Sequence, residues 1–139
     1  MDSIKNWLVR LASLYKDSTP DSKMRARDGA RAETLAADYL KAQGLYILER
    51  NYRVKGGELD LIALDGDSAV FVEVRLRRSA AFGGALASIT PAKQRRLILA
   101  ARCWLRHSGR RGNSRFDCVL LDQLSPDRIE WIKNAFSAD

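Results

Sequence analysis

Two acidic residues interrupt apolar stretches in the middle of the chain. Asp60 lies in GGELDLIALD and Glu73 lies in SAVFVEVRLR, and both stretches otherwise carry side chains typical of strands. An unpaired buried carboxylate is costly, so a cation is expected beside each of them. Paired carboxylates are hard oxygen ligands for Mg²⁺ or Mn²⁺, with water and a substrate phosphate completing the octahedron. The chemistry that such a site supports is hydrolysis of a phosphodiester bond by a metal-bound water.

A hairpin must bring the two carboxylates together. Because side chains alternate along a strand, Glu58 and Asp60 share one face of its first strand. Glu73 and Arg75 share one face of the second. If Asp65-Gly66 forms a two-residue turn, Glu58 lies opposite Glu73 and Asp60 is the diagonal neighbour; a four-residue loop places Asp60 directly opposite Glu73. Both registers place the carboxylates on one face, whereas a slip by one residue separates them.

Arg75 is expected to point the same way as Glu73. In that position it would contact the scissile phosphate and stabilise the charge that develops there. The spacing also fits a plain surface hairpin, whose acids are solvated or form cross-strand ion pairs with Arg75 and Arg77. Spacing alone leaves both interpretations open.

The surrounding sequence predicts the elements that position this hairpin. Apolar residues at helical spacing predict a helix over residues 30–44, which ends at Gly44. A second helix is predicted over residues 90–107, with Thr90 as its N-cap and Pro91 at its first position. Besides the two hairpin strands, strands are expected at residues 45–54, 115–122 and 128–136.

The N-terminal region is expected to stand apart from this domain. Residues 4–15 have the spacing of a short amphipathic helix. Residues 16–29 are polar and lack periodicity, which favours a flexible basic linker. The predicted organisation is therefore an N-terminal helix with its linker over residues 1–27 and a compact domain over residues 28–139.

Composition points to an anionic partner. The 139 residues carry a net charge of +7, so a polyanion such as nucleic acid is favoured. The two cysteines have no metal-binding spacing, which fits a reducing cytoplasm. No apolar run reaches the roughly 18 residues that span a bilayer, so no stable membrane insertion is expected.

The positive charge is concentrated in one part of the chain. Between Arg75 and Phe116 there are many basic residues and no acidic one. A basic helix face followed by a glycine-rich basic loop is suited to contacting a phosphate backbone, with strong salt dependence and weak sequence specificity. The predicted nucleic-acid-binding residues are Arg77, Arg78, Arg95, Arg96, Arg102, Arg106, Arg110 and Arg111.

From about residue 27 to residue 136, the chain resembles the YraN-like family of uncharacterised bacterial proteins. The motifs that carry the resemblance are DGARAE, ERNYR, GELDLI and VFVEVRLR, in this order. That family is similar to the restriction-endonuclease-like PD-(D/E)xK superfamily and to its Holliday junction resolvase-like branch. The resemblance implies an α/β fold with a mixed β-sheet flanked by helices and an αβββαβ core.

The resemblance also implies roles for individual residues. Asp60 and Glu73 would be the metal ligands, and Glu33 the helix-borne acid that helps to hold metal or water. Lys93 and Gln94 match polar positions that contact phosphate or an active-site water. Arg75 occupies the position of the motif lysine. Arginine keeps the positive charge but is effectively never deprotonated. It can therefore take over only part of the role of a lysine that orients the attacking water.

Three functions follow as hypotheses. The first is a Mg²⁺- or Mn²⁺-dependent endonuclease acting on DNA, with branched DNA as a candidate substrate and a homodimer as a candidate assembly. The second is a noncatalytic nucleic-acid-binding or accessory protein that keeps the fold but lost turnover through Arg75. The third is a dimeric or membrane-surface adaptor that works through residues 1–16.

Overall fold

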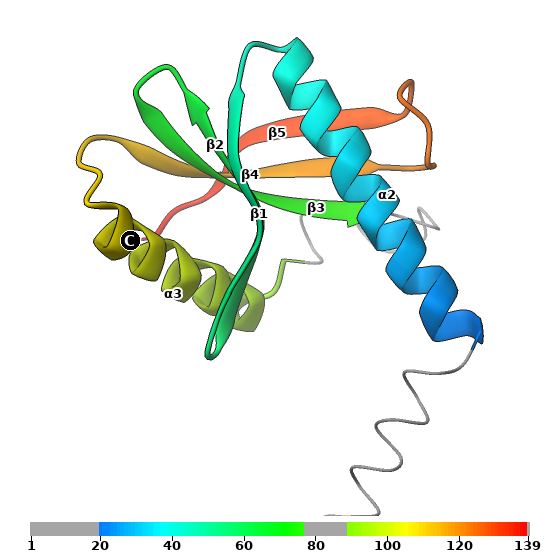
Figure 1. Ribbon diagram of the computed structural model, residues 1–139, viewed down its shortest axis with the longest axis horizontal. Coiled ribbons are helices and arrows are strands. Elements are labelled where there is room, and N and C mark those ends of the chain that lie inside the picture. The colour runs from blue at the N-terminus through cyan, green and yellow to red at the C-terminus, as the bar shows by residue number, and fades with distance from the viewer. Residues whose placement is uncertain (1–19, 77–88, 139) are drawn as a thin grey trace, which may run out of the picture.

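The computed structural model describes residues 20–76 and 89–138 (Figure 1). The predicted N-terminal helix, together with Arg77 and Arg78, lies outside these residues. The described elements are α2 (Pro20–Ala42), β1 (Tyr46–Val54), β2 (Gly57–Asp65), β3 (Ser68–Leu76), α3 (Pro91–Ser108), β4 (Ser114–Leu121) and β5 (Ile129–Phe136).

The strands form one mixed sheet in the order β1-β2-β3-β4-β5. The pairs β1–β2, β2–β3 and β4–β5 are antiparallel, and the central pair β3–β4 is parallel. A parallel pair needs a crossover connection, and the segment that contains α3 provides it. The strands predicted from sequence are all present, and the predicted antiparallel neighbours β1, β2 and β3 are confirmed.

Helix α3 begins at the predicted signals and ends at Ser108, one residue beyond the predicted range. The Thr90 side chain accepts a hydrogen bond from the Lys93 backbone N–H at 3.1 Å, and Pro91 is the first helical residue. Gly109 ends the helix in the left-handed conformation, at φ 68°. The buried face of α3 consists of the residues that the periodicity predicts, which are Leu97, Ala100, Ala101 and Trp104.

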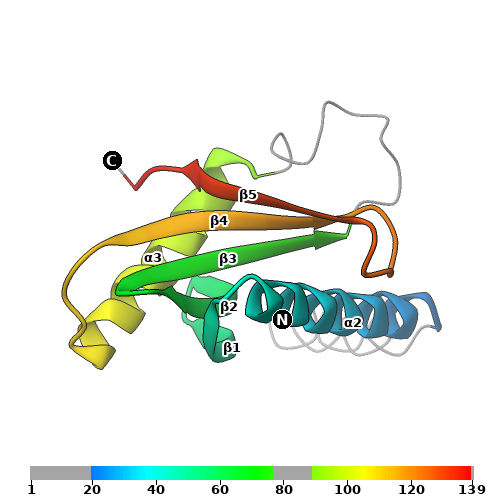
Figure 2. The same ribbon diagram turned by 90° about the horizontal axis from the view of Figure 1, so that it is seen from above.

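The two helices cover opposite faces of the sheet (Figure 2). Helix α2 packs through small residues and Leu40 onto Leu61, Val70 and Val72. Helix α3 packs onto the other face, where Phe71 contacts Trp104 edge to face. A sheet buried on both faces holds its central strands rigidly, so side chains that project from β2 and β3 are placed precisely.

One expectation about the N-terminal region is wrong. The sequence favours a flexible linker up to the start of the compact domain, but residues 20–28 form the first turns of α2. The absence of apolar periodicity shows only that these turns do not pack against the sheet; Met24, for example, is 57% exposed. Lysine, methionine, alanine and arginine are good helix formers, and proline is favourable at a first helical position, so the helix extends into solvent.

The predicted fold class is confirmed. The observed order, with one helix, three strands, a second helix and a fourth strand, is the αβββαβ core of a restriction-endonuclease-like fold, and β5 adds an edge strand. Cys103 and Cys118 are free thiols. In the described part of the chain, neither helix is long and apolar enough to cross a membrane.

Candidate active site

The hairpin register decides how the two acids meet. Leu64 pairs with Ala69 and Asp65 pairs with Ser68, so the turn lies at Gly66–Asp67. Of the two predicted registers, the one that places Asp60 opposite Glu73 is correct. The four-residue loop predicted for it is wrong, because the turn has two residues, and the predicted turn at Asp65-Gly66 is wrong by one residue. Asp65 is the last residue of β2, and its carboxylate accepts a 2.8 Å hydrogen bond from Arg115. Gly66 takes the left-handed conformation that the turn requires.

Asp60 lies where strand β2 changes its facing pattern. Leu59 and Ile62 both pack in the core on the α3 side, whereas Leu61 packs on the α2 side. Strict alternation is therefore broken at Asp60. Its carboxylate accepts a 2.8 Å hydrogen bond from the backbone N–H of Val74, which fixes it against β3. With this irregularity, the carboxylate of Asp60 faces β3. It also interacts electrostatically with Glu33 of α2 and with Lys93 of α3.

Glu73 is the most deeply buried acid of the site, with 4% of its side chain exposed. Its Oε1 atom lies 3.4 Å from Lys93 Nζ and 3.9 Å from Arg75 Nε. Its Oε2 atom is buried and receives no hydrogen bond from residues 20–76 or 89–138. Burial, followed by the negative charge of Asp60, raises the pKa of Glu73 to about 7, against the opposing effect of Lys93 and Arg75.

The pKa of Asp60 is raised as well. Burial is the main cause and the nearby Glu58 adds to it, while the Val74 hydrogen bond and the charge of Lys93 oppose it. A hydrogen bond with Glu73 also lowers the pKa of Asp60. The buried Glu73 and the half-buried Asp60, both with raised pKa values, favour a cation beside them.

Helix α3 delivers one of its two predicted residues to these acids. Lys93 Nζ also lies 3.9 Å from Glu58 Oε1, so the ammonium group sits between two carboxylates. Gln94 is placed differently, because its side-chain amide donates a 3.1 Å hydrogen bond to the carbonyl of Ile89. Lys93 is thus brought into the site, whereas Gln94 braces the start of α3.

Glu33 approaches from helix α2. It lines a pocket of about 380 Å³ together with Asn51, Arg53 and the small residues Ala26, Gly29 and Ala30. Burial and the charge of Asp60 raise the pKa of Glu33, and a hydrogen bond from Asn51 opposes them. Glu33 is thus close enough to Asp60 for the two charges to interact, and its role as the helix-borne acid of the site stays a prediction.

Sequence reasoning missed Asn51. Its φ of 53° is left-handed, which is uncommon for a residue other than glycine. By the β1–β2 register it lies opposite Asp60, and Asn51 contacts Glu33 of α2. The neighbouring Arg50 also reaches α2, where it hydrogen bonds to Thr34 at 3.0 Å. An asparagine inside a strand is unfavourable and tolerates left-handed backbone, and this was the signal available in ERNYR.

The acids can offer a Mg²⁺ or Mn²⁺ ion a set of two carboxylate ligands. Within residues 20–76 and 89–138, no group of three or more His, Cys, Asp or Glu side chains is placed to hold a metal. Asp60 and Glu73 form a two-carboxylate set, and Glu73 Oε2 is a buried oxygen that receives no hydrogen bond from these residues. Mg²⁺ commonly takes one or two protein carboxylates and leaves its remaining positions to water and phosphate. The donor set therefore fits this ion.

Apart from Arg75, the described arginines of the basic stretch divide into two groups. Exposed side chains follow α3 and the loop after it; they belong to Arg95, Arg96, Arg102, Arg106, Arg110 and Arg111. Arg115 turns inward and contacts Asp65 and Asp117, at 2.8 Å and 3.0 Å. Asp117 is fully buried and also accepts hydrogen bonds from the Trp131 side chain and the Asn134 backbone. Arg115 therefore contributes to the sheet and is not part of a basic surface.

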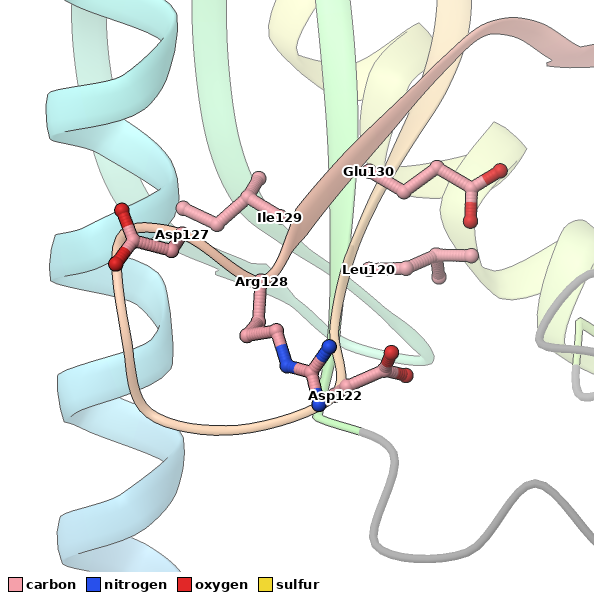
Figure 3. A pocket seen from close by; sticks show the side chains of 6 residues that line it. All are labelled: Leu120, Asp122, Asp127, Arg128, Ile129 and Glu130. Atoms are coloured by element: carbon pink, nitrogen blue, oxygen red, sulfur yellow. The ribbon is translucent and has the colours of Figure 1, made fainter.

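A pocket of about 220 Å³ lies beside the loop between β4 and β5 (Figure 3). It contains none of the residues predicted for catalysis or nucleic-acid binding. Three of its six lining residues are acidic, and one, Arg128, is basic. An acidic lining repels a polyanion, so this pocket is a poor candidate for a phosphate site.

Comparison with known proteins places the chain in a family. The model of "Uncharacterised protein family UPF0102" matches residues 32–121, which include Glu33, Asp60, Glu73 and Lys93. A UPF0102 protein of Cupriavidus taiwanensis is 54% identical over 124 residues, covering 88% of this chain and 91% of the relative. One from Pseudomonas aeruginosa is 50% identical over 115 residues, covering 79% of this chain and 92% of the relative.

A UPF0102 protein of Dechloromonas aromatica is 53% identical over 112 residues and covers 80% of this chain and 89% of the relative. The matched segment contains the C-terminal part of α2, all of α3 and the strands β1 to β4. The chain therefore belongs to the uncharacterised protein family UPF0102, the YraN-like family that its motifs predict.

Proposed function

We propose that this protein is a divalent-metal-dependent endonuclease that hydrolyses phosphodiester bonds in DNA. The observation that supports this proposal best is the convergence of Asp60 and Glu73 in a buried position with Lys93 beside them. A purely structural hairpin would expose its acids or pair each of them fully. Here Glu73 is buried and one of its oxygens receives no hydrogen bond from the described residues, so it is available to a ligand.

Asp60 and Glu73 would hold the ion. When bound, Mg²⁺ or Mn²⁺ activates water and neutralises charge on the scissile phosphate. The protein contributes rigid placement: Val74 fixes the carboxylate of Asp60, and burial between packed layers fixes that of Glu73. Glu33 adds a third carboxyl group from α2, where it can accept a hydrogen bond from a water near Asp60.

The positive charge at the reacting phosphate comes from two elements. Arg75 follows Glu73 on β3, with its Nε atom 3.9 Å from Glu73 Oε1. Lys93 comes from α3 and lies nearer, at 3.4 Å. The sequence EVR lacks the motif lysine two residues after Glu73, and Lys93 supplies an ammonium group to the same carboxylate. An ammonium group is a compact donor that suits a water or a single phosphate oxygen.

Exposed arginines extend the charge along α3. Arg95, Arg102 and Arg106 share this helix with Lys93, and Arg110 and Arg111 continue beyond its end. A row of exposed arginines that starts near the catalytic lysine would hold the nucleic-acid backbone across the site. Recognition of this kind reads backbone and shape more than bases.

The direct test is cleavage of end-labelled DNA by the purified protein in Mg²⁺ and in Mn²⁺. A four-way junction is compared with linear duplex and single strand, because a branched substrate is the first candidate. Asp60→Asn is the matched variant, since it removes charge without changing size. We expect metal-dependent cleavage that Asp60→Asn reduces by about a hundredfold to a thousandfold, which is the scale of losing charge stabilisation in an active site. Equal cleavage by both proteins would contradict the assignment.

A second candidate is a noncatalytic nucleic-acid-binding protein built on the same fold. Arginine at the motif lysine position favours it, because an arginine cannot act as a base. This candidate predicts salt-sensitive DNA binding without cleavage in either metal. Cleavage that appears only in Arg75→Lys would identify a disabled nuclease, whereas cleavage by the native sequence that Lys93→Met abolishes would favour the first proposal.

A further inference from the structure

Lys93 holds the position of a counter-ion within the carboxylate cluster. Its Nζ atom lies 3.4 Å from Glu73 Oε1 and 3.9 Å from Glu58 Oε1, and its charge also acts on Asp60. Of the two cations that contact Glu73, it is the nearer one. A divalent ion between Asp60 and Glu73 would therefore meet an ammonium group at close range. Two cations a few ångströms apart in a partly buried site repel each other strongly.

The ammonium group of Lys93 can move from the carboxylates toward solvent. Its backbone is fixed in the first turn of α3 by the Thr90 cap, but its side chain is 22% exposed and has four flexible carbons. The base of the lysine is thus held near the site while its ammonium group can turn toward solvent. An anion that approaches from solvent, such as a backbone phosphate, would provide a new partner.

We propose that Lys93 is an exchangeable counter-ion: it holds Glu73 when no divalent cation is bound and transfers to a nucleic-acid phosphate when the cation enters. Metal and nucleic acid then bind cooperatively, because each relieves a cost that the other imposes. The metal frees the lysine, and the phosphate accepts it. This inference rests on the proposed function, since it assumes that Asp60 and Glu73 hold the ion.

The first measurement is the affinity of the protein for Mn²⁺ without DNA. The concentration of free Mn²⁺ in each titration is measured by electron paramagnetic resonance. The proteins compared are the native chain, Lys93→Met and Lys41→Met, which removes the same charge at the far end of α2. All three proteins are titrated at the same pH and ionic strength, so that their affinities can be compared directly. We expect Lys93→Met to bind Mn²⁺ about tenfold more tightly than the native protein, because a competing cation is gone. Lys41→Met should bind as the native protein does.

The second measurement is the affinity for labelled DNA, from fluorescence anisotropy in Ca²⁺ and in EDTA. We expect Ca²⁺ to tighten DNA binding by the native protein and by Lys41→Met, and to do so less in Lys93→Met, which has no ammonium group to transfer. Circular dichroism and thermal unfolding establish that each variant is folded, and Lys93→Gln serves as a second variant if Lys93→Met is not.

The outcomes distinguish a failure of the counter-ion exchange from a failure of the proposed nuclease function. Unchanged or weaker Mn²⁺ binding by Lys93→Met, in a protein whose native form cleaves DNA, would overturn the exchange and leave the nuclease intact. A native protein that binds no Mn²⁺ would overturn both. Tighter Mn²⁺ binding by Lys93→Met together with a smaller effect of Ca²⁺ on DNA affinity would support the exchange.

Discussion

At the scale of single residues, the site is defined by the buried Glu73 and the half-buried Asp60 beside it. Glu73 and Asp60 both have raised pKa values, and burial is the largest cause for each. Lys93 and Arg75 compensate the charge of Glu73 only in part, since its pKa still lies at about 7. In a site of this kind, the ionised acids destabilise the metal-free protein, and a bound cation relieves this destabilisation.

The pH dependence of stability tests this view. A carboxyl group whose pKa rises from 4.5 in the unfolded chain to about 7 in the folded protein is bound to more protons when folded. Its contribution to stability is therefore fully present below pH 4.5 and is lost as the pH rises through 7. We expect the metal-free protein to lose at most about 3 kcal/mol between these values, by the conversion of 1.36 kcal/mol per pH unit.

The matched variant is Glu73→Gln, which cannot ionise. Its free energy of unfolding, measured with urea from pH 5 to pH 8 in EDTA, should fall less with pH than that of the native protein. A pH dependence equal to the native one would show that Glu73 titrates near its ordinary pKa and is not held in a strained environment.

At the scale of elements, the position of the site depends on how closely α3 packs on β2. Gly57 lies directly beneath α3, and a Cβ atom there would collide with the backbone carbonyl of Arg96 and crowd Ala100. The first turn of the same helix carries Lys93. A side chain at position 57 would therefore push away the element that delivers the lysine.

The substitution Gly57→Ala tests this close approach. We expect it to destabilise the fold by about 1–3 kcal/mol, the range for overpacking, and to reduce cleavage if the protein is a nuclease. Gly29→Ala is the control: nothing lies within 4 Å of a Cβ atom at this position in the middle of α2. Alanine there should stabilise the helix by up to about 1 kcal/mol. Urea unfolding of both variants measures the difference, and equal stabilities would contradict the close approach.

At the scale of the whole molecule, charge is distributed unevenly. Exposed arginines follow α3 and its loop, whereas the pocket near the β4–β5 loop is lined by three acidic residues and one basic residue (Figure 3). A polyanion is therefore attracted to the α3 side and repelled at the pocket.

Salt dependence of DNA binding tests this asymmetry. The double variant Arg106→Gln/Arg110→Gln should bind DNA more weakly, and the slope of log affinity against log salt should fall by about 0.9 for each phosphate that the protein no longer neutralises. Arg128→Gln, in the acidic pocket, is the control and should keep the native slope. Anisotropy titrations across a range of salt concentrations give these slopes; a reduced slope in Arg128→Gln instead would place the nucleic acid on the other side of the molecule.

Much of the fold follows from local features of the sequence. Side-chain periodicity predicts both described helices and all five strands, and cap residues such as Thr90 and Gly44 mark helix ends, because these signals act within a few residues of each other. The first turns of α2 escaped prediction because they make no core contacts and so leave no apolar pattern.

In the candidate site too, some features follow from the sequence and others only from the tertiary structure. From the sequence by itself, strand alternation and a short turn predict that Asp60 and Glu73 lie on one face of a hairpin, either directly opposite each other or as diagonal neighbours. Only the tertiary structure decided which register forms, that Lys93 reaches Glu73 while Gln94 does not, and that Arg115 is used within the sheet. Those outcomes depend on how α3 and β4 pack against β2 and β3, and packing between distant segments leaves no periodic signal in the chain.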